Sequence, residues 1–178
     1  MKKIFKINIA LALLLLFSCS DDEGKVEPNT FGFSYSNNFY ALNQAWFEDL
    51  NVIDETPSDI SLTLSNVNLG LANAISNVSK VDFTIQNLID LQPGTYEVIP
   101  NYSIEIGSYF DAEGNYVTGT SVLNTETGLT ASSTLVTINQ VDLEDNFIDL
   151  NFQFVRNDGQ VIEGVYQGTL NNDSVAPE

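Results

Sequence analysis

The one cysteine of this 178-residue chain, Cys19, directly follows an apolar run. A thiolate is a good nucleophile, so this side chain can be acylated or alkylated. No second cysteine exists, so an intramolecular disulfide bond is impossible. Three lysines precede the apolar run from Ile7 to Phe17, which is shorter than the ~20 residues that a transmembrane helix needs. Residues 1–18 are therefore predicted to be an export signal peptide and not a membrane span.

The segment around this cysteine, Leu16-Phe17-Ser18-Cys19, resembles the lipobox of bacterial lipoproteins. In that family the cysteine becomes the first residue of the mature protein and carries three acyl chains. Leu16 and Ser18 match the aliphatic and small residues that precede it, whereas Phe17 is bulkier than the usual residue. The resemblance implies lipidation of Cys19, and about two acyl chains already hold a protein on a membrane. The alternative is an ordinary signal peptide with an incidental cysteine.

The residues that follow the cysteine, Ser20, Asp21, Asp22 and Glu23, form a polar and acidic run. This run resembles the export signal that sends lipoproteins of the Bacteroidota to the outer face of the outer membrane. The resemblance implies an outer-membrane protein that faces the cell surface. The alternative is a plain tether, because disordered segments are commonly acidic. Residues 19–29 are predicted to be a lipidated acidic tether in either case.

The charge balance limits the partners of the chain. The formal net charge is −18, and removal of a signal peptide with three of the six basic residues and no acidic one lowers it to −21. So few cations cannot neutralise a nucleic-acid backbone, which excludes nucleic-acid binding. Binding to anionic lipid headgroups is excluded for the same reason, so the membrane contact is expected only through Cys19.

The absence of histidine excludes the common catalytic sites. The chain has no imidazole for a Ser-His-Asp triad or for a usual zinc site. A pair of carboxylates could still hydrolyse a glycoside, but 24 acidic residues form many such pairs by chance. The chain is therefore predicted to be no enzyme, with no catalytic residue and no cofactor.

One acidic loop is a candidate calcium site because calcium prefers oxygen ligands. Asp111, Glu113 and Asn115 place oxygen donors at alternate positions, as an EF-hand loop does. Tyr116 then stands where that motif needs glycine, and Val122 where it needs glutamate. The segment is interpreted as a hairpin loop, and no metal ligand is predicted.

Aromatic residues are the other candidate for binding, since a sugar ring stacks on an exposed aromatic side chain. Tyr35, Phe39, Tyr40, Trp46 and Phe47 crowd around the expected first hairpin, and a second group surrounds the Asp111 loop. Trp46 has the parity of Tyr40 and is predicted to face the core. The simpler interpretation assigns most of these rings to the core.

The elements that position these residues are predicted to be strands, because apolar residues recur with period two. Ile148, Leu150, Phe152 and Phe154 alternate with polar residues, and turn sequences such as Asn37-Asn38 and Asn157-Asp158-Gly159 separate similar runs. We expect one all-β domain over residues 30–170, an antiparallel β-sandwich of about eight to ten strands. The alternative is a closed, lipocalin-like β-barrel.

Residues 171–178 are predicted to be a disordered tail. Within it, Asp173-Ser174-Val175 resembles a bacterial acceptor for O-glycosylation on Ser174.

These features predict a surface-anchored lipoprotein whose β-domain binds a glycan or a protein without catalysis. Two alternatives stay open: an accessory subunit of an envelope complex, and a carboxylate-dependent glycoside hydrolase. The oligomeric state is not predicted, and the domain itself resembles no particular family.

Overall fold

A computed structural model describes residues 30–49, 56–71 and 75–174, and Cys19 with its acidic run lies outside them. The described residues form twelve strands and one 3-10 turn, η1 (Leu69–Leu71), and no helix among them is long and apolar enough to cross a bilayer. The strands are β1 (Gly32–Tyr35), β2 (Asn38–Ala41), β3 (Gln44–Asp49), β4 (Ser58–Ser65), β5 (Val78–Leu88), β6 (Gly94–Tyr96), β7 (Asn101–Phe110), β8 (Tyr116–Val117), β9 (Thr120–Asn124), β10 (Ala131–Asp142), β11 (Phe147–Arg156) and β12 (Val161–Asn172).

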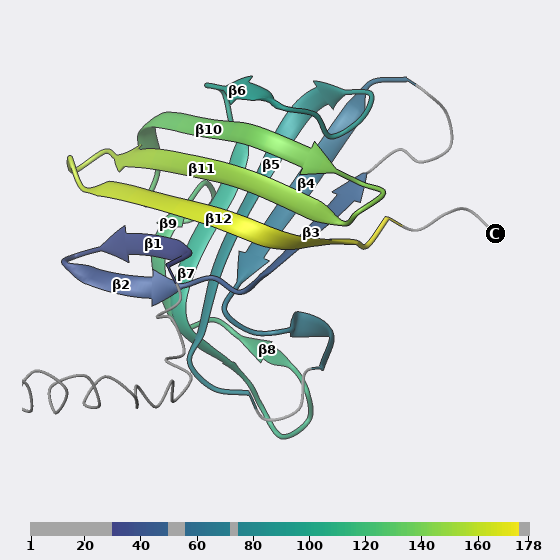
Figure 1. Ribbon diagram of the computed structural model, residues 1–178. Coiled ribbons are helices and arrows are strands. Elements are labelled where there is room, and N and C mark those ends of the chain that lie inside the picture. The colour runs from purple at the N-terminus through teal and green to yellow at the C-terminus, as the bar shows by residue number, and fades with distance from the viewer. Residues whose placement is uncertain (1–29, 50–55, 72–74, 175–178) are drawn as a thin grey trace, which may run out of the picture.

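All twelve strands belong to one mixed sheet with the order β6-β10-β11-β12-β3-β4-β5-β7-β8. The β1–β2 hairpin attaches to β12, and β9 attaches to β7. The sheet curls into a half-barrel, so that β10, β11 and β12 cross in front of β3, β4 and β5 (Figure 1). The predicted all-β class is confirmed. The number of strands exceeds the eight to ten expected, because short strands such as β6 and β8 carry too few residues to show alternation.

One pair of strands departs from the antiparallel pattern that the sequence predicts. The end of β12 runs parallel to β3, with Leu170 opposite Ala45 and Asn172 opposite Phe47. Alternation cannot reveal strand direction, so this pairing was not foreseen. It connects the two halves of the half-barrel.

The same pairing corrects the expected start of a disordered tail at Asn171. β12 continues to Asn172, and the amide of Asp173 donates to the carbonyl of Phe47 at 2.9 Å. The hydroxyl oxygen of Ser174 accepts a 2.8 Å hydrogen bond from the amide of Asp49. Backbone pairing does not need apolar side chains, which is why the polar composition of this segment misled the prediction. The glycosylation of Ser174 stays a prediction.

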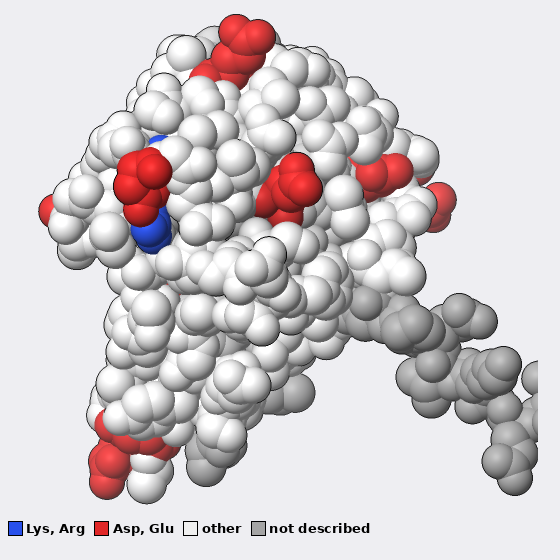
Figure 2. All heavy atoms as spheres, turned by 90° about the vertical axis from the view of Figure 1, so that its left-hand side faces the viewer, with Lys and Arg blue, Asp and Glu red and all other residues white. Residues whose placement is uncertain are grey.

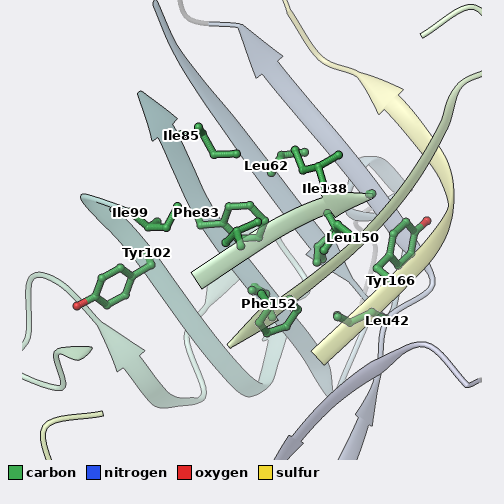
Figure 3. Packing of buried hydrophobic residues seen from close by; sticks show 14 of the residues in the cluster. Leu42, Leu62, Phe83, Ile85, Ile99, Tyr102, Ile138, Leu150, Phe152 and Tyr166 are labelled. Atoms are coloured by element: carbon green, nitrogen blue, oxygen red, sulfur yellow. The ribbon is translucent and has the colours of Figure 1, made fainter. Parts of the chain in front are cut away.

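The core lies between the two halves of the sheet. Leu62, Phe83 and Tyr102 come from one half and face Leu150 and Phe152 from the other (Figure 3). Aromatic rings meet across this space: the ring centroids of Phe83 and Phe152 lie 6.4 Å apart, and those of Tyr102 and Phe154 lie 5.4 Å apart. The alternating run of β11 is thus buried on one side, as the sequence indicates.

Trp46 does not belong to this main core. Ala45 and Phe47, its neighbours in β3, are core residues, so alternation directs Trp46 to the opposite side of the sheet, where it is 9% exposed. Trp46 is one of the buried hydrophobic residues, so its predicted burial is confirmed, although it lies outside the main core cluster.

Candidate functional site

The outer surface of β1, β10, β11 and β12 carries an open groove of about 360 Å³. A second hollow of about 360 Å³ adjoins it on the side of Gln160 and Val161. Ser34, Phe39 and Glu163 line both hollows, so the two form one continuous depression. We call this depression the sheet groove. Its first hollow also includes Leu135, Asn151, Gln153 and Val165.

The strand register explains how residues far apart in the chain meet in the sheet groove. Phe39 lies opposite Ser34, Ser34 opposite Glu163, Glu163 opposite Gln153, and Gln153 opposite Leu135. Residues directly opposite each other in paired strands have side chains on the same side of the sheet. These five residues therefore form one row across five strands.

A second row runs beside the first. Gly32 lies opposite Val165, Val165 opposite Asn151, and Asn151 opposite Thr137. In β11 the outward positions Asn151 and Gln153 alternate with the buried side chains of the core. The period-two pattern that builds the core thus also builds the groove on the other side of the strand.

Phe39 stands at one end of the first row, and a tight hairpin fixes its position. Ser36 and Asn37 both have positive φ, at 49° and 63°, which is typical of a type I′ turn between two strands. On the inner side of the hairpin, the rings of Phe33 and Tyr40 stack with centroids 5.1 Å apart. The ring of Phe39 is directed outward and is 53% exposed.

The ring of Phe39 has room in this position because Gly32 carries no side chain. A Cβ atom at Gly32 would lie 2.6 Å from Cζ of Phe39 and 2.2 Å from the carbonyl oxygen of Tyr40. Both distances are shorter than a van der Waals contact. The ring therefore rests over a position that only glycine can occupy in this backbone.

Four polar side chains of the sheet groove are free to bind. Within residues 30–49, 56–71 and 75–174, the side chains of Ser34, Asn151, Gln153 and Glu163 make no hydrogen bond to the protein. Their donors and acceptors face water. They are therefore available to a ligand.

As far as its described lining shows, the sheet groove is acidic and lacks cations. Glu163 is the only charged residue in the described lining of the two hollows. The cations that the structure describes, Lys80 and Arg156, are paired with Asp82 and Asp158. The hydrogen bond from Arg156 lowers the pKa of Asp158 to about 2, so this carboxylate stays ionised at neutral pH. Figure 2 shows that acidic side chains on one side of the molecule form small separate groups among uncharged residues.

A second polar cluster lies away from the sheet groove, where β8 and β9 pack on β7. The buried carboxylate of Glu105 accepts a 2.7 Å hydrogen bond from Tyr116 and a 3.3 Å bond from Ser108. The amide of Gly119 donates to the Ser108 hydroxyl at 2.9 Å. Burial raises the pKa of Tyr116, and the bond to Glu105 adds to the effect. These bonds attach the β8–β9 segment to the sheet, which is a structural role.

In the acidic loop that is the candidate calcium site, the Asp111 carboxylate is used for hydrogen bonds within the loop. Asp111 accepts hydrogen bonds from the amides of Glu113 and Asn115 at 3.0 and 2.8 Å, and from the Asn115 side chain at 3.0 Å. The bonds from Asn115 are the main cause of a lowered Asp111 pKa. In the part of the chain that the structure describes, no three acidic residues are grouped so that they could hold a metal ion.

The structure tests only some of the residues singled out from the sequence. Cys19 and Ser20, Asp21, Asp22 and Glu23 lie outside the described residues. Among the aromatic candidates near the first hairpin, Phe39 lines the sheet groove, whereas Trp46 is buried. In the second group, beside the Asp111 loop, Tyr109 is exposed on β7. The sequence missed Ser34, Leu135 and Glu163 as neighbours of Phe39, since only the register brings them together.

The structure thus defines an all-β protein with an open, weakly acidic groove on the outside of a curled sheet. Comparisons with known proteins found no matching family model, no matching curated protein and no matching solved structure.

Proposed function

We propose that this chain is a lipoprotein held on the outer face of a bacterial outer membrane by a lipid on Cys19, and that its β-domain binds an external ligand in the sheet groove. Three features of the sequence support the proposed location: the signal peptide, the lipobox-like segment and the acidic run after Cys19. The observation that carries the binding function is the row from Phe39 to Leu135, which joins an exposed ring to free polar groups.

The composition of the sheet groove favours binding over catalysis. Ligand sites combine apolar or aromatic contacts with a few placed polar groups, and the groove has both. Glycoside hydrolysis by carboxylates needs two of them flanking the bond, and the described lining of the groove supplies Glu163 alone. The domain therefore holds its ligand unchanged.

The anchor is tested by replacing its acceptor residue. Cys19→Ala is expected to release a soluble protein or to leave the precursor unprocessed, and to abolish labelling with radioactive palmitate. The wild-type chain should be removed from intact cells by added protease. If the wild-type chain resists protease while a known surface lipoprotein is cut, the proposed cell-surface exposure is wrong. Palmitate labelling tests the lipid anchor independently of this result.

Binding is tested with the full-length protein purified in mild detergent. A glycan array and a pull-down from envelope extracts should both be run against the Phe39→Ala variant. We expect enrichment of a ligand by the wild type that the variant loses. Equal recovery by both proteins would contradict binding in the sheet groove.

A further inference from the structure

The ring of Phe39 stands between two hollows. One hollow extends toward Asn151 and Val165, and the other toward Gln160 and Val161. A ligand that fills both must be extended and must pass beside this ring. A single small molecule would fill only one of them, so the shape of the sheet groove favours a chain of linked units.

The charge of the sheet groove excludes one class of chain. Glu163 is the only charged side chain in the described lining, and neither Lys80 nor Arg156 contributes to it. A sulfated or carboxylated polymer would place its negative charges beside Glu163 without a cation to balance them. The units of the ligand that contact the groove are therefore not negatively charged.

The strands that form the floor also limit how a peptide could bind. β11 and β12 are paired on both sides, and β1 lies between β12 and β2. In these three strands the backbone amides and carbonyls are used within the sheet, so a peptide cannot pair with them as a further strand. Recognition over β1, β11 and β12 must therefore come from side chains.

The side chains in the sheet groove match the two kinds of surface on a sugar, its C–H faces and its hydroxyl groups. The exposed ring of Phe39 and the side chain of Val165 offer apolar contact to the C–H side of a pyranose. Asn151 and Gln153 can each donate and accept hydrogen bonds, and the Glu163 carboxylate accepts them. Hydroxyl groups both donate and accept, so they suit this set.

From these observations we infer that the ligand is an uncharged oligosaccharide. It lies across both hollows, with one ring stacked on Phe39 and its hydroxyls bonded to Asn151, Gln153 and Glu163. This inference rests on the proposed binding function, and it names the ligand class for the same groove.

The test measures calorimetric binding of two probe sets to the full-length protein in detergent. One set contains neutral gluco-, xylo- and manno-oligosaccharides of one to six units, and the other contains oligogalacturonates and chondroitin sulfate oligosaccharides. We expect binding of at least one neutral series, with affinity that rises with length until both hollows are filled. Acidic probes should bind more weakly than neutral ones of equal length.

Two variants and a control locate the site. Phe39→Ala should weaken binding about tenfold, the equivalent of one lost stacking contact, whereas Phe39→Trp should preserve it. Tyr109→Ala removes an exposed aromatic ring on β7 outside the groove and should leave the affinity unchanged. Phe39 is half-exposed, so its loss should not unfold the domain, and circular dichroism melting checks this.

Three outcomes would overturn the inference. They are tighter binding of acidic probes, equal affinity of wild type and Phe39→Ala, and no binding across the neutral series. If the neutral probes fail while the pull-down recovers a protein in a Phe39-dependent way, the proposed binding function stands and the oligosaccharide is wrong. If both assays fail, both proposals fail.

Discussion

The hydroxyl of Tyr116 donates a 2.7 Å hydrogen bond to a carboxylate oxygen of Glu105, a side chain that is only 7% exposed. The amino group of Lys80 lies 4.9 Å from the centre of the Tyr116 ring. Tyr116 belongs to β8, a strand of two residues, whereas Glu105 lies within the long strand β7. This hydrogen bond therefore fixes a short strand that has little backbone pairing of its own.

Removing the Tyr116 hydroxyl should destabilise the domain. Tyr116→Phe leaves the ring in place but deprives a buried carboxylate of its closer hydrogen-bond donor, which costs about 1–3 kcal/mol. Urea unfolding followed by circular dichroism measures the loss. Tyr109→Phe is the matched control, because Tyr109 is exposed on the same strand as Glu105, and its effect should stay within about 0.5 kcal/mol. Equal stability of the two variants would contradict this role.

The hydroxyl of Tyr166 should lose its proton at a higher pH in the folded chain than in the unfolded chain. Burial raises its pKa to about 12, and its hydroxyl donates to the carbonyl of Thr169 at 2.8 Å. The unfolded chain releases this proton near pH 10, so between pH 10 and 12 the folded state binds more protons. Stability is therefore lost as the pH rises through this window.

Absorbance at 295 nm measures this titration. We expect a tyrosinate step near pH 12 that is absent in Tyr166→Phe and that moves to about pH 10 in urea. The slope of stability against pH above 10 should also be smaller in the variant. A wild-type titration that finishes near pH 10 under native conditions would show that Tyr166 is not protected.

Gly164 should tolerate no side chain. A Cβ there would lie 2.4 Å from Cζ of Phe152 and 2.9 Å from the carbonyl oxygen of Gly32. Gly164→Ala therefore overpacks the core, at a cost of about 1–3 kcal/mol in the free energy of unfolding.

A second substitution tests the cause of this effect. Phe152→Leu removes the ring that the new methyl group meets, so the Gly164→Ala/Phe152→Leu double variant should lose less stability than the two single losses combined. Additive losses would assign the effect to the Gly32 carbonyl instead. Val165→Ala, an exposed neighbour in β12, is the control for the strand itself.

The end of β12 should contribute measurably to stability. Deleting residues 171–178 removes the pairing of Asn171 and Asn172 with β3. It also removes three hydrogen bonds: from the Asn171 side chain to the carbonyl of Ala45, from the Asp173 amide to the carbonyl of Phe47, and from the Asp49 amide to the Ser174 hydroxyl. At about 1 kcal/mol for each hydrogen bond, we expect a loss of about 3 kcal/mol and a lower melting temperature. Deleting only residues 175–178 should have no such effect, and equal melting of the two deletions would refute the contribution.

The sequence predicts the fold class because alternation and turn residues are local signals. In the run from Ile148 to Phe154, buried residues alternate with less buried ones, as the period of two indicates. Asn157-Asp158-Gly159 lies at a hairpin where Gly159 has φ +87°. Strand order and direction are not local. The parallel contact of Leu170 with Ala45 joins segments at opposite ends of the domain, and no pattern within either segment reveals it.

The candidate site could be predicted only in part for the same reason. Phe39 is recognisable as an aromatic residue near a turn, and Gln153 as an outward position. That they share one row with Ser34, Glu163 and Leu135 follows from four separate strand registers. Each register depends on packing between segments that are distant in the sequence, so the row appears only in the folded chain.

The position of β12 also has a consequence for when the protein folds. This strand follows all the others in the chain, yet it pairs with β11, with β1 and with β3. Until β12 has been synthesised, the β1–β2 hairpin has no partner strand and the two halves of the sheet are not joined. Contacts between such distant segments form slowly. The two halves of an emerging chain thus stay apart through most of its synthesis, and the half-barrel closes only once the last strand is free.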